Sequence, residues 1–134
     1  MTDPLKFQEV IGHQFPIFTR EQSLPLNIYE GWYPIVEKFL VRLHEMYLAA
    51  PHKDEWLQTL KILAIKEKFG TLRVYFHAPI SRSQRLELLS ILDAAAKTCE
   101  LCGQPGMLRK DSTGWSMRTR CDEHYKQELL RQNF

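Results

Sequence analysis

Apolar residues recur at regular intervals through residues 31–49 of this chain. The interval is that of an amphipathic helix, with charged residues between the apolar ones. The apolar positions are Trp32, Ile35, Val36, Phe39, Leu40, Leu43, Met46 and Tyr47. Pro51 follows, and the residue before a proline is disfavoured in the helical conformation. We therefore predict a helix over 31–49 whose apolar face is part of the core.

Apolar and polar residues alternate instead in residues 60–78, a pattern typical of strands with one buried face. Leu72, Val74 and Phe76 are the apolar members of the second half, and Gly70 supplies a turn between the halves. We predict an antiparallel hairpin packed against a helix. Its exposed face is either an ordinary solvated surface or a binding patch, and it carries Lys66, Lys68, Arg73, Tyr75 and His77.

A second helix is predicted after Pro79. Ser81 and Gln84 have the spacing of a capping box, in which each side chain accepts a hydrogen bond from the backbone N–H of the other residue. The helix extends to about residue 97. Its predicted inner face consists of small and apolar residues, namely Leu86, Leu89, Leu92, Ala95 and Ala96.

The pattern is less regular in residues 1–29 and 52–59. The first segment is rich in apolar residues, but Gly12, Pro16 and Pro25 interrupt it. We expect an extended strap lying over the core, and a polar connector over 52–59. The predicted fold class is α+β, with amphipathic helices on a small antiparallel sheet.

Composition agrees with a globular chain of this class. The 134 residues are 44% hydrophobic and 25% charged, with a net charge of +2. The charge is uneven, because residues 1–60 hold 5 Lys/Arg against 8 Asp/Glu and residues 61–134 hold 13 against 8. A net charge of +2 does not by itself argue for nucleic acid. The second half is the better place for an anionic partner.

Three cysteines and one histidine form two pairs near the C-terminus. Cys99 with Cys102, and Cys121 with His124, each have two residues between their members. This is the ligand pattern of a tetrahedral Zn²⁺ site of the Cys₃His kind. All three cysteines are used, and four protein ligands leave no open position for catalysis. We predict one structural zinc ion per chain.

Short elements are predicted between and after these pairs. Residues 107–110 and 115–120 can form a hairpin, and a last helix over 122–132 would dock through Tyr125, Leu129 and Leu130. The domain organisation is then a body, residues 1–98, with a C-terminal module, residues 99–134, packed on it as one unit. Candidate binding residues on the hairpin are Arg109, Lys110, Trp115, Arg118 and Arg120, and Lys66, Lys68 and Arg73 would extend this surface if the two hairpins are neighbours.

The order of knuckle, hairpin and ligand-bearing helix resembles that of treble-clef zinc fingers. The Cys-x-x-Cys-Gly-x-Pro-Gly, Gly-Trp and Cys-Asp-Glu-His motifs are also similar to those of small bacterial and phage or prophage proteins of unassigned function. That group also shares a Gly-Trp-x-Pro segment, here residues 31–34, and a hairpin segment, here residues 65–73. The resemblance implies a Cys₃His zinc site but no mechanism.

These observations favour a non-enzymatic, zinc-stabilised protein-binding module, and phage context would suit an inhibitor, immunity or anti-defence protein. The alternative is a nucleic-acid-binding zinc finger that uses the basic hairpin 107–120. An enzyme with an unrecognised site and a structural part of an oligomer also remain open. We see no small-molecule site, no leader peptide and no apolar run that could span a membrane. Free cysteines in metal spacing favour a reducing compartment, and we expect a cytoplasmic location.

Overall fold

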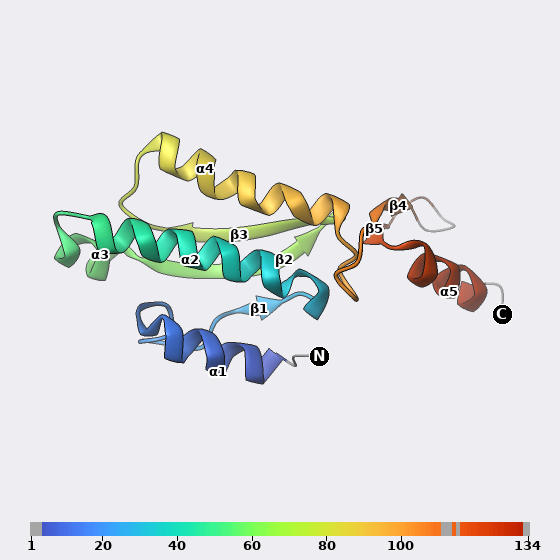
Figure 1. The fold of residues 1–134 in the computed structure, drawn as a ribbon, viewed down its shortest axis with the longest axis horizontal. Helices are drawn as coiled ribbons and strands as arrows, with labels where there is room; N and C mark the ends of the chain where they lie inside the picture. Colours follow the sequence, from blue (N-terminus) through green and yellow to red (C-terminus); the bar gives the residue numbers. More distant parts are fainter. Residues whose placement is uncertain (1–3, 111–113, 115, 133–134) are drawn as a thin grey trace.

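The computed structural model describes residues 4–110, 114 and 116–132 and has the predicted α+β class. The helices are α1 (Pro4–Gln14), α2 (Tyr33–Ala49), α3 (Lys53–Thr59), α4 (Arg82–Leu92) and α5 (Asp122–Gln132). The strands are β1 (Leu26–Asn27), β2 (Lys61–Lys68), β3 (Thr71–His77), β4 (Met107–Lys110) and β5 (Met117–Arg120). In Figure 1, α2 and α4 lie across one face of the main sheet, and β4, β5 and α5 lie at one end of it.

The main sheet has the strand order β1-β2-β3. The β2–β3 hairpin is antiparallel, as predicted, and its turn consists of Phe69 and Gly70, with φ values of 54° and 79°. Two successive positive φ values suit a two-residue hairpin turn whose twist matches that of the strands. The short strand β1 was not predicted. It pairs parallel to β2, with Leu26 opposite Ile65, so the sheet is mixed rather than purely antiparallel.

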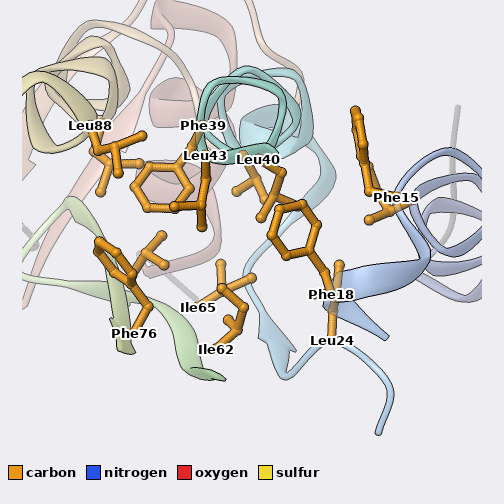
Figure 2. Close-up of a cluster of buried hydrophobic side chains, with 14 of the residues drawn as sticks. Phe15, Phe18, Leu24, Phe39, Leu40, Leu43, Ile62, Ile65, Phe76 and Leu88 are labelled. Carbon is orange, nitrogen blue, oxygen red and sulfur yellow. The ribbon is translucent and has the colours of Figure 1, made fainter. Parts of the chain in front are cut away.

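The predicted helix over 31–49 is confirmed, with its α-helical part beginning at Tyr33 after a 3-10 turn, Glu30–Trp32. Its apolar face is buried as expected. Figure 2 shows Phe39 and Leu43 pointing toward Ile65 and Phe76 of the sheet. Burying a side chain of this size contributes about 1.5–3 kcal/mol each, so this layer is the main source of stability in the body.

The inner face predicted for the second helix is wrong in part. The capping box of Ser81 and Gln84 is present, and α4 begins at Arg82. However, Leu86 and Leu89 are exposed, while Leu88 and Leu92 are buried. The α-helix also ends earlier than predicted, at Leu92. A 3-10 helix, Asp93–Lys97, follows it, and in this segment Ala95 is buried and Ala96 is exposed. The leucines fall on two adjacent stripes, and only the direction of packing on α2 selects the stripe that is buried.

The extended strap predicted for residues 1–29 is also wrong. Most of its first half is α1, which continues through Gly12 because one glycine costs a helix only about 1 kcal/mol. The expectation that its apolar residues pack is confirmed in part, since Phe7, Ile11, Phe15 and Phe18 are buried, whereas Leu5 and Val10 are exposed. The predicted connector 52–59 likewise contains a short helix, α3, with Trp56 buried.

Each helix of the described part of the chain is too short or too polar to cross a membrane.

Candidate metal centre

The four predicted ligands lie together at the junction of the body and the C-terminal module. Cys99 and Cys102 are in the turn that follows the 3-10 helix, Cys121 immediately precedes α5, and His124 is in the first turn of α5. Their ligand atoms all lie within 4.8 Å of one another. His124 Nδ1 is 3.2 Å from Cys121 Sγ and 3.5 Å from Cys99 Sγ, and Cys102 Sγ is 3.8 Å from Cys121 Sγ. The cluster therefore fits one metal ion.

The first ligand pair is held by a tight turn. The backbone N–H of Gly103 donates to the carbonyl of Cys99 at 2.8 Å, and the N–H of Cys99 donates to the carbonyl of Gln104 at 2.8 Å. Gly103 has a φ of 80°, a left-handed conformation that glycine adopts without steric cost. This turn brings both sulfur atoms to the same side of the chain.

The surroundings of Cys99 favour the thiolate, which is the metal-binding form of cysteine. Burial alone raises the pKa of this thiol, but hydrogen bonds from the backbone of Cys121, Cys102 and Leu101 outweigh burial and lower the pKa to about 7. Partial desolvation raises the pKa of Cys102 above its ordinary value, and the neighbouring Cys99 and Cys121 add to this rise. The cluster is therefore asymmetric, with Cys99 as the thiol that ionises more readily of the two.

The segment Gly31–Trp32 fastens this turn to the body. The N–H of Gly31 donates to the carbonyl of Glu100 at 2.9 Å, and Nε1 of Trp32 donates to the carbonyl of Thr98 at 2.8 Å. A Cβ atom at Gly31 would lie only 2.2 Å from the carbonyl oxygen of Cys99. Glycine is therefore required at this position, because the two backbones are in direct contact.

The β2–β3 turn fastens the other side of the module. Oγ1 of Thr119 donates to the carbonyl of Gly70 at 2.6 Å, and Nη1 of Arg118 lies 3.0 Å from Oε1 of Glu67. The two hairpins are thus neighbours. The segments 31–34 and 65–73, which the sequence singles out as motifs, both contact the C-terminal module.

A buried ion pair lies behind the first ligand pair. Glu100 and Arg120 are only 2% and 5% exposed, and their Oε2 and Nη1 atoms are 3.1 Å apart. Nε of Arg120 also contacts Oε1 of Glu128 in α5 at 2.6 Å. Burial raises the pKa of Glu100, while Arg120 and the N–H of Thr119 oppose this rise. No local pattern in the sequence indicates that Glu100 is buried, since its partner Arg120 is twenty positions away, in β5.

The arginines of the predicted nucleic-acid surface on β4 and β5 are largely occupied by acidic partners. Nη2 of Arg109 is 2.6 Å from Oδ1 of Asp122, and Arg118 and Arg120 contact Glu67 and Glu100. The expectation that Arg120 is a surface residue is wrong, because its side chain is buried. Lys110 is exposed. Trp115 lies outside the described residues.

The predicted docking of the last helix is also wrong in part. Leu129 and Leu130 are 37% and 54% exposed, and none of the described residues of α5 is fully buried. Tyr125 is half-buried, with the guanidinium carbon of Arg109 4.5 Å from the centre of its ring. α5 is therefore held by polar contacts rather than by an apolar face, and it carries the candidate ligand His124.

Lys66, Lys68 and Arg73 are exposed on the main sheet, as predicted. Gly70, in the same hairpin, contacts Thr119 of the C-terminal module. The carboxylates that pair with the arginines of β4 and β5 form no ion pair with Lys66, Lys68 or Arg73 in the described part of the chain.

Comparison with protein-family models, curated proteins and solved structures finds no match to this chain.

Proposed function

We propose that the chain is a non-enzymatic protein-binding module in which a structural zinc ion holds the C-terminal module on the α+β body. The observation that carries the metal part is the four-ligand cluster. With Zn–S bonds of about 2.3 Å and Zn–N bonds of about 2.0 Å, tetrahedral ligands lie about 3.5–3.8 Å apart. Three of the six separations between ligand atoms are 3.2, 3.5 and 3.8 Å, and all six are within 4.8 Å, which suits a shell of this size around one ion.

A structural role is favoured over a catalytic one. The three thiolates and the imidazole would fill a tetrahedral shell, whereas a catalytic zinc keeps one position for water or substrate. Cys99 is buried, and its backbone is anchored to Gln104 and Gly103. The order of knuckle, β4–β5 hairpin and α5 supports a treble-clef arrangement. In this proposal the ion supplies folding energy, and the surface that it stabilises performs the function.

Acidification is expected to release the metal. Protons must leave both Cys99 and Cys102 before these sulfurs bind zinc, and the pKa of Cys99 without metal is about 7. Below this pH, each thiol proton that zinc must displace lowers the apparent affinity by about tenfold per pH unit, so those of Cys99 and Cys102 alone lower it by about a hundredfold per pH unit. Release can be followed with a chromophoric chelator across the range from neutral to mildly acid pH. An affinity independent of pH over this range would contradict thiolate ligation.

The proposed protein partner docks in the groove beside strand β3. This strand ends the sheet order, and a groove of about 630 Å³ runs between it and α4. Its apolar lining includes Val74, Leu89, Leu92 and Ala96. A sheet edge beside a helix can accept an extended segment of another protein as an additional strand, with pockets for alternate side chains. An inhibitor, immunity or anti-defence role would use this surface to capture one partner.

A Leu89→Glu variant tests this surface. The charge would lie in the apolar groove, so a purified partner, first identified by cross-linking and mass spectrometry, is expected to bind at least about tenfold more weakly by calorimetry. The matched control is Leu129→Glu, because Leu129 is 37% exposed on α5 and Leu89 is 39% exposed. Equal binding by both variants and by the unmodified protein would exclude the groove as the docking site.

The alternative of nucleic-acid binding through residues 107–120 has less support, because Arg109, Arg118 and Arg120 already contact carboxylates. Each would have to break an internal ion pair to reach a phosphate.

A further inference from the structure

The outward side of the main sheet is strongly basic. We define the open sheet face as the side of β2 and β3 that points away from α2 and α4. Its side chains are exposed or half-buried, and they are Lys61, Leu63, Ala64, Lys66, Lys68, Thr71, Arg73, Tyr75 and His77. Four of these residues carry a permanent positive charge and none carries a negative one. The acidic residue of the hairpin, Glu67, pairs with Leu72 on the opposite side of the sheet.

The cations of this face have no acidic partners in the described part of the chain. None of the ion pairs there includes Lys61, Lys66, Lys68 or Arg73. Moreover, Lys66 and Arg73 are directly opposite each other in the register of β2 and β3. Like charges at opposite positions destabilise a sheet. Opposed cations without an acidic partner among the described residues favour a site where another molecule supplies the negative charge.

Aromatic rings lie among these cations. Tyr75 is 39% exposed in the middle of β3, and Nζ of Lys66 is 5.2 Å from the centre of its ring. Phe69 is 61% exposed at the tip of the hairpin, and Nζ of Lys68 is 5.9 Å from the centre of its ring. Phe69 also has a φ of 54°, a conformation that bulky residues rarely adopt. The backbone strain and the exposure of the apolar ring at this position both lower the stability of the folded chain.

We propose that the open sheet face binds single-stranded nucleic acid. Phosphates contact Lys66, Lys68 and Arg73, while bases stack on the rings of Tyr75 and Phe69. A sheet face with exposed rings between cations suits unpaired bases, since every base presents a stacking surface and a duplex hides it. β3 spans roughly 23 Å at about 3.3 Å per residue, enough for a few nucleotides. This surface borders the protein-binding groove, whose lining also includes Thr71, Arg73 and Tyr75. The inference concerns a ligand of another class, so it goes beyond the proposed function and does not depend on it.

The first measurement is the binding of labelled oligothymidine and oligouridine of about 12 nucleotides to the zinc-loaded protein by fluorescence anisotropy. Each phosphate contact on a single strand contributes about 0.7 to the slope of log affinity against log salt concentration. Engagement of Lys66, Lys68 and Arg73 predicts a slope of about −2. A duplex of the same length is expected to bind at least about tenfold more weakly, because its bases cannot stack on the protein.

The second measurement compares two double variants that remove the same charge. Lys66→Gln with Arg73→Gln is expected to weaken binding by about tenfold or more and to reduce the size of the salt slope by about 1.4. The control, Lys38→Gln with Lys126→Gln, changes exposed lysines on α2 and α5 and is expected to change affinity by less than about twofold. The first variant should have a melting temperature equal to or above that of the unmodified protein, because it removes an opposed like-charge pair.

A Tyr75→Leu variant separates stacking from charge. Loss of one stacked base is expected to weaken binding by about tenfold, with the salt slope unchanged. The proposal is overturned if no oligonucleotide binds at low salt, if the duplex binds as well as the single strands, or if the two double variants weaken binding equally. Binding to vesicles rich in anionic lipid without binding to either oligonucleotide would also overturn it, since that result indicates a membrane surface as the partner.

Discussion

A Cys102→Ser variant is expected to bind no zinc and to lose the ordered structure of the C-terminal module. Cys102 is exposed, so the substitution removes a metal ligand and almost no packing. Structural zinc contributes on the order of 10 kcal/mol to the folding of small metal modules. Buried apolar side chains add little to this module, since no described residue of α5 is fully buried and the buried residues of β5, Thr119 and Arg120, are polar. Zinc content by mass spectrometry should fall from about one per chain to about zero.

Hydrogen exchange locates the structural effect of the same variant. Amides of β4, β5 and α5 should lose their protection, while amides of α2 and β2 should retain most of theirs. The matched control is Gln104→Ser, an exposed position in the same turn whose backbone carbonyl, rather than its side chain, accepts from Cys99. That control should keep its zinc. A metal-free Cys102→Ser protein with unchanged stability and unchanged exchange would refute the structural role of the ion.

A Gly31→Ala variant is expected to destabilise the protein by about 3 kcal/mol or more, although it adds a single methyl group far from Cys102 in the sequence. The added Cβ would lie 2.2 Å from the carbonyl oxygen of Cys99 and 2.5 Å from the carbonyl carbon of Glu100, both backbone atoms. Overpacking costs about 1–3 kcal/mol, and each lost hydrogen bond, from Gly31 and from Trp32, adds about 0.5–1.5 kcal/mol. A chain of this size should then melt roughly 10 °C lower.

Gly12→Ala is the matched control for this prediction. A Cβ at Gly12 would meet only the side chain of Thr19, at 3.3 Å, and alanine favours a helix over glycine. We expect its stability to change by less than about 1 kcal/mol. Gly31→Ala should also weaken zinc binding, since the displaced backbone is that of a ligand. If both glycine variants melt at the same temperature, the contact between Gly31 and the ligand turn does not stabilise the protein.

Local signals account for much of what the sequence predicted correctly. The capping box of Ser81 and Gln84, the turn at Gly70 and the ligand pairs of the metal site all depend on residues within a few positions of one another. The helical period of residues 31–49 also identified α2 and its buried face. These features are confirmed because each is formed by an interaction between residues that are close together in the sequence.

The errors arise where distant residues decide the outcome. Leu88 is buried rather than Leu89 because of the side on which α2 packs against α4. The sequence of α4 alone does not specify that side. The arginines of β5 are paired because Glu67 and Glu100 come near them only in the folded chain. β1 is two residues long and exists only as a partner of β2, so no strand pattern could reveal it. The sequence identifies Gly31 as part of a motif, but it does not predict that the backbone of Gly31 contacts that of Cys99.

The contact between Gly31 and the ligand turn also has a consequence for the order in which a newly made chain matures. During synthesis, the N-terminal part of a chain emerges and folds first. The start of α2 would then be in place to receive Thr98 and Glu100 as soon as these residues emerge, so Cys99 and Cys102 would be positioned before Cys121 and His124 have emerged. We expect the ion to be captured first by a half-formed site on an already folded body, and capture to be completed only when α5 closes over it.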